Sequence, residues 1–588
     1  MRPAAHPSRE DHTETMTTAS ESRFDIHDIP FSTCGSWFNL SPVVALHDHT
    51  DDVHLVSHRN GMHAVLSLVP ERDGHPVSTR WQADPTLFAW CDDDGGGVVE
   101  AAYDGPGALR LRGSGGTAMR LGDAAGALTP FTGSYLYREP VDDSAVFTSY
   151  ETGHRYRVTA LSGAMDVIGD QALGTAERAV VLGADGAPWE SVLQETTSSA
   201  DPYRAGADFD AVVAAAGQAF AGYLDALAPW RDDRTPAAAR AAYVLWSATV
   251  GPAGFTTRTS VLMSKHWMDK LWSWDHCFNA LALAPGLTDA AVDQFLAPFD
   301  HQDATGALPD SITHSEVLYN YVKPPIHGWA LRRLRESAGR PLTPGELERI
   351  YDGLCRWTDF WLTRRRAPGH VLPYYQHGND SGWDNATTFD HDRVVESPDL
   401  AAFLVLQLDA VAGLGTELGH RVDRWTAERD AVLGALLDQL WMPDGFVAVG
   451  VGSGRASTTT SLLTTLPIVL ADRLPPAVRD HLVAAIEQHL TKHGLATEPV
   501  DSPQYEADGY WRGPIWAPST ALIEDGLRHA GAVELADVVS ARFRELCERS
   551  GFAENFNART GDGLRDRAYT WTAAVYLTLA AQHVRRGR

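Results

Sequence analysis

The chain has 588 residues, of which 44% are hydrophobic and 21% charged, and its formal net charge is -27. The length suggests about two or three domains, and the composition is typical of a globular protein. Nucleic acids and anionic membrane surfaces attract clusters of Lys and Arg, so the negative charge argues against both as partners. It is compatible with a small-molecule partner, and the oligomeric state stays open.

Tryptophan and cysteine are the informative residue types. The chain holds 18 Trp, whose flat faces are common platforms for sugar rings but are also common in protein cores. Its five Cys are scattered without CxxC spacing, which indicates neither a disulfide framework nor a zinc site. We expect reduced thiols in a cytoplasmic protein. We expect no cofactor either, because the chain shows no phosphate loop, nucleophile elbow or dinucleotide fingerprint.

The first part of the chain reads as a polar leader followed by β structure. Residues 1–22 lack an apolar signal-peptide core and are expected to be disordered. We find no apolar run near the roughly 20 residues of a membrane helix, which predicts a soluble protein without a membrane partner. From 23 to 205, short alternating apolar runs such as His63 to Val69 are separated by Gly-rich turns such as Gly113 to Gly116. This pattern predicts an antiparallel β-sandwich. The acidic run that starts at Asp92 is expected to be a hairpin turn rather than a calcium loop.

The remainder of the chain is expected to be helical. Residues 206–235 read as a helical linker, and 236–588 carry apolar residues at helical spacing, often after a Pro at the start of a helix. The segments that predict helices are Pro236 to Val250, Trp274 to Ala284, Asp289 to Phe299, Ile326 to Glu336, Pro344 to Arg364, Pro398 to Leu418, Val422 to Trp441, Pro476 to Lys492, Pro514 to Arg528, Val533 to Glu548 and Ala568 to Arg585. About a dozen helices suit an all-α (α/α)6 toroid of six hairpins, in which alternate loops emerge on one face.

Two acidic residues in polar, aromatic-rich loops are candidates for catalysis. Asp384 lies in a Ser-Gly-Trp-Asp-Asn run and Glu554 in an Ala-Glu-Asn-Phe-Asn run, each without a basic neighbour in sequence. Such surroundings tend to raise the pKa of a carboxyl group. Two carboxyls across a sugar site are the minimal equipment of a glycoside hydrolase. Alternatively, Asp384 caps a loop and Glu554 bonds to the backbone.

Further side chains in these loops are candidates for sugar binding. Asp275 can accept two hydroxyls, and at least one of Trp272 and Trp274 should face the sugar, although both could belong to a core stripe. Arg512 could hold a hydroxyl or orient a carboxylate, or simply pair with Glu506 or Asp508. The histidines show no metal-type spacing and are expected to act as hydrogen-bonding groups. The remaining candidates are Lys323, Asn379, Asp380, Trp383, Asn385, Tyr510, Trp511 and Trp516.

Five motifs in this part of the chain resemble those of glycoside hydrolase family 63 and its relatives, the mannosylglycerate-hydrolase-like enzymes and the trehalases. They are Trp272-Ser273-Trp274-Asp275-His276-Cys277-Phe278, Lys323-Pro324-Pro325, Asn379-Asp380-Ser381-Gly382-Trp383-Asp384-Asn385, Tyr510-Trp511-Arg512-Gly513-Pro514-Ile515-Trp516 and Glu554-Asn555-Phe556-Asn557. The resemblance spans residues 236–588 and implies an (α/α)6 barrel, often preceded by a β-sandwich. It also implies Asp384 as general acid, Glu554 as general base and hydrolysis with inversion.

The resemblance leaves the substrate open. Residues 28–37 match no defined substrate class, and the further signatures of trehalases are missing. We therefore expect a cytoplasmic, bacterial, exo-acting α-glycosidase, most simply an α-glucosidase for short α-glucosides. A glucosylglycerate or mannosylglycerate hydrolase is the nearest alternative and would use Lys323, Arg512 or Arg559 to hold a carboxylate. A sugar isomerase, epimerase or lyase would rely on His276, His314 or His377, and a non-catalytic sugar-binding protein would not need both acids.

Overall fold

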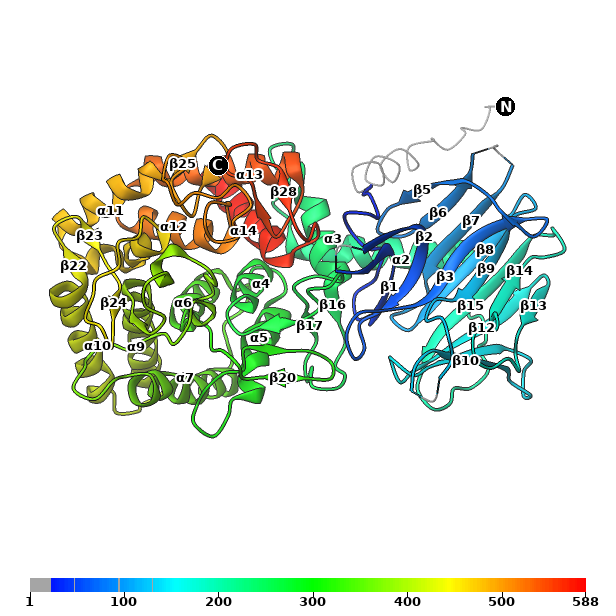
Figure 1. Cartoon of the computed structure of the whole chain (residues 1–588), viewed down its shortest axis with the longest axis horizontal. Coiled ribbons are helices and arrows are strands. Elements are labelled where there is room, and N and C mark those ends of the chain that lie inside the picture. The colour runs from blue at the N-terminus through cyan, green and yellow to red at the C-terminus, as the bar shows by residue number, and fades with distance from the viewer. Residues whose placement is uncertain (1–22, 47, 94–95, 130, 588) are drawn as a thin grey trace, which may run out of the picture. The chain divides into compact units, whose positions relative to one another are not determined.

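A computed structural model describes residues 23–46, 48–93, 96–129 and 131–587, so the expected leader at 1–22 lies outside the described residues. The chain divides into two compact units, Met1–Leu224 and Asp225–Arg588 (Figure 1). The division falls within helix α2 (Phe209–Leu227), in the segment where we expected a helical linker.

The N-terminal unit consists of antiparallel β-sheets, as predicted. One sheet has the order β1-β2-β3-β9-β14-β13, with β4 paired to β3, and the other has the order β10-β11-β12-β15-β8-β7-β6-β5. The strands are β1 (Phe38–Ala45), β2 (Asp48–Ser57), β3 (His63–Arg72), β4 (His75–Pro76), β5 (Thr79–Ala83), β6 (Phe88–Asp92), β7 (Val98–Tyr103), β8 (Ala108–Ser114), β9 (Ala118–Asp123), β10 (Ser134–Arg138), β11 (Ala145–Ser149), β12 (Arg155–Ser162), β13 (Met165–Ile168), β14 (Ala179–Leu182) and β15 (Trp189–Thr196).

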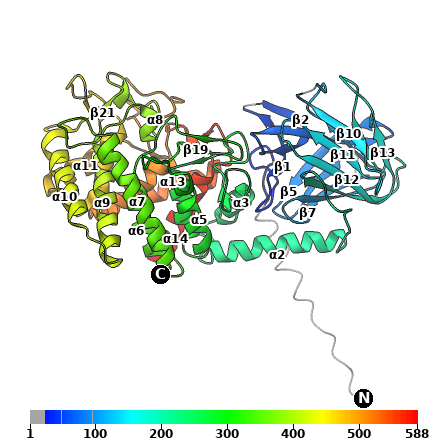
Figure 2. The same cartoon turned by 90° about the horizontal axis from the view of Figure 1, so that it is seen from below.

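The two sheets share one core. Alternate residues of strands in both sheets, such as Leu66 and Leu68 in β3 and Leu109 and Leu111 in β8, belong to a single buried apolar cluster. Figure 2 shows the sheets stacked on each other. Because successive side chains of a strand point to opposite faces, Arg110 leaves this core on the other side of β8, where it pairs with Glu190.

The C-terminal unit is helical. Its α-helices are α3 (Ala238–Ala248), α4 (His276–Leu283), α5 (Thr288–Leu296), α6 (His327–Ser337), α7 (Pro344–Arg364), α8 (Gly378–Ser381), α9 (Pro398–Glu417), α10 (Asp423–Ala435), α11 (Pro476–Gln488), α12 (Ala517–His529), α13 (Val533–Ser550) and α14 (Thr570–Arg586). The other helical segments are the 3-10 helices η1 (Ala297–His301), η2 (Thr387–Phe389) and η4 (Leu462–Arg473) and the π-helical turn η3 (Leu436–Leu440). Two-residue strands β16 to β28, all between Thr249 and Leu564, form small hairpins and bridges in the connecting loops.

The helices of this unit pack in a closed cycle. Helix α4 contacts α6, α6 contacts α9, α9 contacts η4, η4 contacts α12, α12 contacts α14, and α14 contacts α4 again. Other helices pack outside this cycle: α5 against α4, α7 and α10 against α9, α11 against η4, α13 against α12, and α3 against α14. The positions of the predicted helices are confirmed.

One member of the cycle was not predicted from the sequence. Segment η4 is mostly a 3-10 helix with Pro467 inside it, and the backbone at Ala471 leaves the helical region. Pro removes a hydrogen-bond donor and clashes with the preceding turn, so a regular α-helix cannot run through it. The apolar side chains of η4 are nevertheless buried, because α9 and α12 pack on either side of it.

The expectation that no apolar run reaches the length of a membrane helix is wrong for helix α9. Among the described residues, Pro398–Glu417 is long and apolar enough to cross a membrane by length and composition, and 78% of the apolar window is buried inside the structure. It contacts α6, α7, α10 and η4, so its apolar surface is covered by neighbouring helices.

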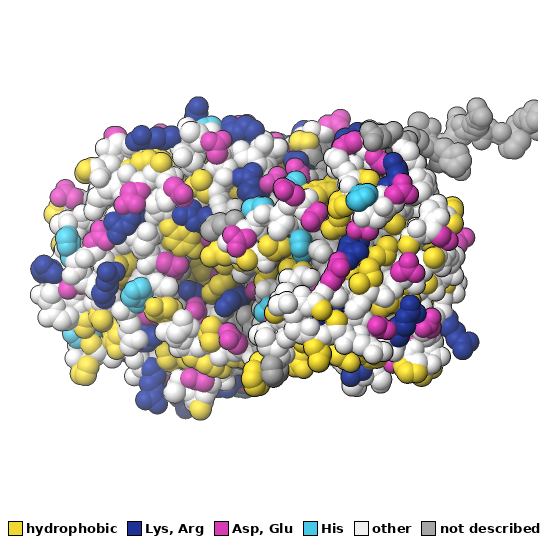
Figure 3. Space-filling view, turned by 45° about the vertical axis from the view of Figure 1, so that its right-hand side comes forward, with side chains coloured by type: hydrophobic (Ala, Val, Ile, Leu, Met, Phe, Trp, Pro, Cys, Tyr) yellow, Lys and Arg dark blue, Asp and Glu magenta, His cyan; other side chains and the backbone are white. Residues whose placement is uncertain are grey.

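Charged side chains of both signs are interspersed on the face drawn in Figure 3. Many of the charges are paired in the structure; Arg258 pairs with both Asp293 and Asp300 at 2.9 and 2.6 Å. This face therefore differs from the continuous basic stripe that binds nucleic acid.

Packing in the N-terminal unit generates a stability prediction. An added Cβ at Gly113 of β8 would lie 2.2 Å from the indole of Trp189, whereas at Gly107, in the same hairpin, the nearest atom is 3.8 Å away. We expect Gly113→Ala to destabilise the unit by about 1–3 kcal/mol through overpacking. Gly107→Ala should stay within about 0.5 kcal/mol of wild type. Calorimetric unfolding measures both, and equal transitions for the two variants would contradict the packing argument.

Candidate active site

The candidate residues gather in loops that lead into the helices of the closed cycle. Asp275 is the residue before α4, and Lys323 lies shortly before α6. The loop with Tyr510 leads into α12, and the loop with Glu554 leads towards α14. Asp384 follows the short helix α8 and precedes α9. The motifs are far apart in sequence, but the helices bring them together.

Lys323 is the centre of one cluster of charges. The lysine is 6% exposed, and its Nζ lies 3.1 Å from Asp310 Oδ1 and donates to the backbone oxygen of Asn379 at 2.8 Å. Burial alone would lower the pKa of Lys323, but Asp384, Asp310 and Asp275 outweigh it and raise that pKa. The lysine therefore stays an ammonium group, which three carboxyls surround.

Two of the carboxyls around Lys323, those of Asp275 and Asp384, have raised pKa values. Burial raises the pKa of Asp275 to about 8, although Lys323 works against it. Burial also raises the pKa of Asp384, and Lys323 again opposes it. Oδ2 of Asp275 is buried without a hydrogen-bond partner among the described residues. Buried polar atoms are normally paired, so this oxygen is available to an incoming hydroxyl.

Glu554 is the second buried acid of the site. Its side chain is 1% exposed, and its Oε1 has no hydrogen-bond partner in the part of the chain that the structure describes. Burial raises the pKa of Glu554 to about 8, Asp566 adds to the increase, and Tyr510 and Arg565 oppose it. The charge of Asp384 raises the pKa of Glu554 further, as a smaller contribution than that of Asp566.

Tyr510 and Arg565 lie next to this acid in unusual backbone conformations. Their φ angles are 62° and 61°, in the left-handed region that non-glycine residues rarely adopt. The guanidinium of Arg565 lies 4.9 Å from the centre of the Tyr510 ring. Arg565 also donates to Asn555 Oδ1 at 3.2 Å and pairs with the exposed Asp508 at 2.6 Å. Backbone strain of this kind is common where side chains must be aimed at a functional site.

The loop that carries Asp384 is held rigidly by residues predicted to bind sugar. Asp380 is 1% exposed; it pairs with Arg365 at 2.6 Å and accepts the backbone N–H groups of Val322 and Gln376. These contacts occupy both of its carboxylate oxygens. Asp380 is therefore an organiser of the loop rather than a ligand for sugar, which corrects the sequence-based interpretation.

Asn385 and Arg512 join this loop to the loop before α12. Asn385 donates to Gly509 O at 3.0 Å and accepts the N–H of Trp511 at 3.0 Å. Arg512 donates to Asn385 O at 2.9 Å and pairs with Asp390. Neither Glu506 nor Asp508 is the partner of Arg512, contrary to the alternative that we considered. These contacts hold the segment that carries the neighbouring Asp384, and the predicted sugar binding by Asn385 and Arg512 stays a prediction.

The tryptophans of the motifs form a buried column rather than exposed platforms. Trp511 stacks in parallel on Trp516 at 4.0 Å, Trp383 packs on Trp511 at 4.6 Å, and all are at most 1% exposed. Trp516 and Trp274 both meet Trp571 edge to face. Trp383, Trp511 and Trp516, which we predicted to bind sugar, therefore expose no ring face in this structure, and Trp274 is 2% exposed. Trp272 remains partly exposed.

Gly382 is required by the same packing. It ends α8 with φ of +74°, and a Cβ there would lie 2.5 Å from the ring of Trp274. The motif Ser-Gly-Trp-Asp therefore has a structural reason for its glycine: the chain must turn in the left-handed region against an indole.

Several residues of the site were missed by the sequence reasoning. Asp310 was not singled out in the sequence, although it is 6% exposed and pairs with Lys323. Arg565, Asp566 and Tyr569 follow Glu554 in the same loop, and Tyr569 is 3% exposed. The density of charged and aromatic residues between Glu554 and α14 was a signal, but it did not show which of them face the acid.

One group of described residues has donor atoms spaced for a metal ion. The ligand atoms of His276, Cys277 and His327 lie within 4.8 Å of one another and all three residues are buried. Nδ1 of His276 faces the backbone oxygen of Trp272 at 3.0 Å, and burial lowers the pKa of His276 to about 4. Three donors are one fewer than structural zinc sites use, so we assign this group to the core.

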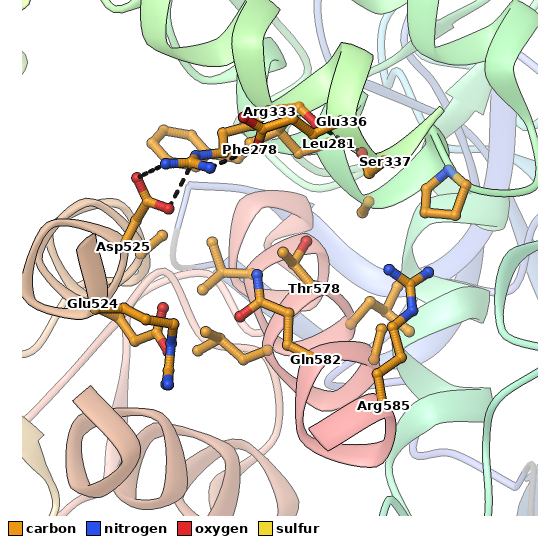
Figure 4. Close-up of a pocket in the computed structure, with 18 of the residues that line it drawn as sticks. Phe278, Leu281, Arg333, Glu336, Ser337, Glu524, Asp525, Thr578, Gln582 and Arg585 are labelled. Carbon is orange, nitrogen blue, oxygen red and sulfur yellow. Dashed lines mark hydrogen bonds and ion pairs between the residues drawn. The ribbon is translucent and has the colours of Figure 1, made fainter. Parts of the chain in front are cut away.

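A separate cavity of about 240 Å³ lies elsewhere in the helical unit (Figure 4). It is lined by parts of α4, α6, α12 and α14, and Arg333 reaches across it to Asp525 at 2.9 Å. None of the predicted catalytic or sugar-binding residues lines it. The chemistry described above therefore belongs to the loops and not to this cavity.

Comparison with known proteins agrees with the geometry of these loops. The family model for the mannosylglycerate hydrolase MGH1-like glycoside hydrolase domain matches residues 268–572. The chain is 29% identical over 444 residues to a glucosylglycerate hydrolase of Mycolicibacterium hassiacum, which covers 58% of this chain and 97% of that protein. It is 24% identical over 408 residues to a mannosylglycerate hydrolase of Rubrobacter radiotolerans, covering 53% and 90%.

Solved structures share the fold. A family 63 mannosylglycerate hydrolase from Thermus thermophilus superposes with a TM-score of 0.52 at 20% identity, covering 58% of this chain and 99% of that one. A bacterial glucoamylase superposes with a TM-score of 0.60 at 11% identity and covers 95% of both chains. Since the family model matches more than half of the chain and includes Asp275, Lys323, Asp384 and Glu554, this protein belongs to the mannosylglycerate hydrolase MGH1-like family and is a glycoside hydrolase.

Proposed function

We propose that the protein hydrolyses a glycosidic bond between a hexose and glycerate, with inversion at the anomeric carbon. Relatives that act on glucosylglycerate and mannosylglycerate match more than half of this chain and nearly all of their own length. This replaces our first expectation, an α-glucosidase for short α-glucosides, because the comparisons favour the glycosylglycerate alternative.

The architecture supports a site of this kind. We infer that the helical unit is an (α/α)6 toroid, since the cycle α4-α6-α9-η4-α12-α14 closes on itself and outer helices pack around it. The shared fold with a glucoamylase supports the same inference. In a toroid of this type the loops that enter the inner helices lie at one end, which is where the acidic residues are found.

The observation that carries the proposal is that two buried carboxylate oxygens of the site, Asp275 Oδ2 and Glu554 Oε1, have no hydrogen-bond partner among the described residues. Buried acids without partners are uncommon in proteins and are typical of catalytic sites. Together with Asp384, these residues give the site a proton donor, a base for water and a further acceptor for sugar hydroxyls. Asp384 is assigned as acid and Glu554 as base from the family resemblance.

A substrate with a carboxylate requires a cation, and we assign this role to Arg565. Lys323 already compensates three carboxyls, and Arg512 pairs with Asp390. Arg565 lies beside Glu554 and Tyr510, and its partner Asp508 is 66% exposed, so a substrate carboxylate can replace that partner at little cost. Arg559 stacks on Tyr505 at 4.7 Å and donates to Val500 O, away from the acids.

The isomerase, epimerase and lyase alternative loses its support. His276 is fully buried and bonded to the backbone, and the family to which the chain belongs consists of glycoside hydrolases. A non-catalytic sugar-binding protein would not need both Asp384 and Glu554, and burial raises the pKa of both carboxyls here.

A proton NMR time course tests the reaction itself. We expect the purified protein to release a β-hexose from an α-hexosyl-glycerate, because water attacks the face opposite the leaving group. Methyl α-glucoside and maltose serve as comparison substrates and should react more slowly. Initial release of the α-anomer would refute inversion, and faster cleavage of maltose would restore the α-glucosidase expectation.

The roles of the two acids can be separated with an activated substrate. Asp384→Asn and Glu554→Gln should each lose about 10²–10⁴-fold in kcat on the glycosylglycerate. With the α-glycosyl fluoride, whose leaving group needs no proton, Asp384→Asn should recover most of its activity and Glu554→Gln should not. Recovery in Glu554→Gln alone would reverse the assignment.

Arg565→Gln tests the recognition of glycerate. We expect kcat/KM for the glycosylglycerate to fall about 10-fold more than kcat/KM for the methyl glycoside, because the charge-assisted contact is lost with the first substrate alone, whereas the loss of Arg565 beside Glu554 affects both. Arg559→Gln is the matched control, since both arginines lie over a tyrosine ring. A larger effect in Arg559→Gln would move the carboxylate site to that residue.

A further inference from the structure

Another buried carboxylate, that of Asp566, interacts with Glu554 and belongs to none of the sequence motifs. Asp566 is 0% exposed; its Oδ1 lies 3.1 Å from His266 Nδ1 and accepts the N–H of Ala568 at 3.0 Å, and its Oδ2 accepts from the hydroxyl of Ser264. His266 is 1% exposed. Burial acts to raise the pKa of Asp566, but the bonds to His266, Ser264 and Ala568 outweigh it and lower that pKa. This group therefore stays ionised inside the protein.

Asp566 is tied directly to the proposed base. The backbone N–H of Glu554 donates to the backbone oxygen of Asp566 at 2.7 Å. Asp566, Arg565 and Asp384 act on the Glu554 carboxyl through their charges, and Tyr510 acts on it through a hydrogen bond. Asp566 ranks first among them and disfavours ionisation of Glu554, as Asp384 does, whereas Tyr510 and Arg565 favour it. A like charge in a dry environment makes the neighbouring carboxylate a stronger proton acceptor.

We propose that Asp566 and His266 are positioning residues for the reaction: a buried carboxylate–imidazole pair that fixes the loop carrying Glu554 and holds a negative charge behind its carboxyl. The proposal rests on the proposed function for its catalytic consequence. Its physical part, the charge acting on Glu554, holds whatever the substrate is.

A purely structural role for Asp566 must be separated from this one. The segment with Ser264 and His266 also meets the start of α14 through Thr570, whose N–H donates to Met263 O at 2.8 Å and whose hydroxyl donates to Leu262 O at 3.0 Å. Thr570→Val removes part of this connection without removing a charge. It is therefore the control for loss of structure alone.

The decisive measurement is a carbon-13 NMR titration of the Glu554 carboxyl, identified by the signal that is missing in Glu554→Gln. In Asp566→Asn, which is nearly isosteric, we expect the pKa of Glu554 to fall by about one unit or more, the size of effect that a nearby like charge produces. Thr570→Val should lower the unfolding temperature and leave this pKa unchanged. An unchanged pKa in Asp566→Asn, or an equal fall in Thr570→Val, would overturn the proposal.

If Asp566→Asn does not fold, a second variant tests whether the charge of Asp566 acts on Glu554. In His266→Gln the negative charge of Asp566 is compensated less, so the pKa of Glu554 should rise. A fall or no change in the pKa of Glu554 would overturn the proposal. In the active enzyme, the acid limb of the pH–kcat profile should move to lower pH in Asp566→Asn, because Glu554 then loses its proton at lower pH. If no glycoside is cleaved by wild type, the proposed function fails while the titration still tests the charge.

Discussion

The site depends on one buried cation. Lys323 is the ammonium group that lies among Asp275, Asp310 and Asp384, and without it three carboxyls could not be held together away from water. The lysine opposes the effect of burial on Asp275 and Asp384, so the protonation of both acids depends on its position. Its place is set by the backbone oxygen of Asn379, which belongs to the same loop as Asp384. The contacts of Lys323 therefore both compensate the charges of the acids and fix the loop that carries Asp384.

Around Glu554, the other acid proposed for catalysis, the arrangement of charges is the opposite. Around Glu554 the strongest electrostatic neighbour is a like charge, Asp566, and the compensating groups are the Tyr510 hydroxyl and Arg565. Both of these residues adopt left-handed backbone conformations, and Arg565 lies over the ring of Tyr510. The fold thus holds one acid next to a cation and the other next to an anion. Two carboxyls in unlike surroundings are the arrangement that acid–base catalysis needs.

Aromatic residues contribute to this site through rigidity more than through contact with a ligand. Trp383, Trp511 and Trp516 form a stacked, buried column between the loop of Asp384 and the loop before α12. Asn385 and Arg512 join the same loops by hydrogen bonds. A catalytic side chain works only when the residues around it hold it in place, so many residues of each motif serve to fix the catalytic residue. This explains why motifs so rich in polar and aromatic residues have few side chains free for sugar.

The sequence alone determined the class of each unit, the positions of most helices, the motifs and the two acidic residues proposed for catalysis. Local patterns carry that information, because strand alternation, helical spacing and turn residues are properties of neighbours along the chain. Only the tertiary structure decided that Asp380 binds Arg365, that Trp383 is buried, and that Asp310, Arg565 and Asp566 belong to the site. Segment η4 was not predicted for a related reason. Pro467 interrupts the helical pattern of its sequence, and the segment is helical in the folded chain because it packs against α9 and α12. Burial and electrostatic coupling arise between residues that are distant in sequence, such as His266 and Asp566, 300 positions apart, so they exist only once the chain has folded.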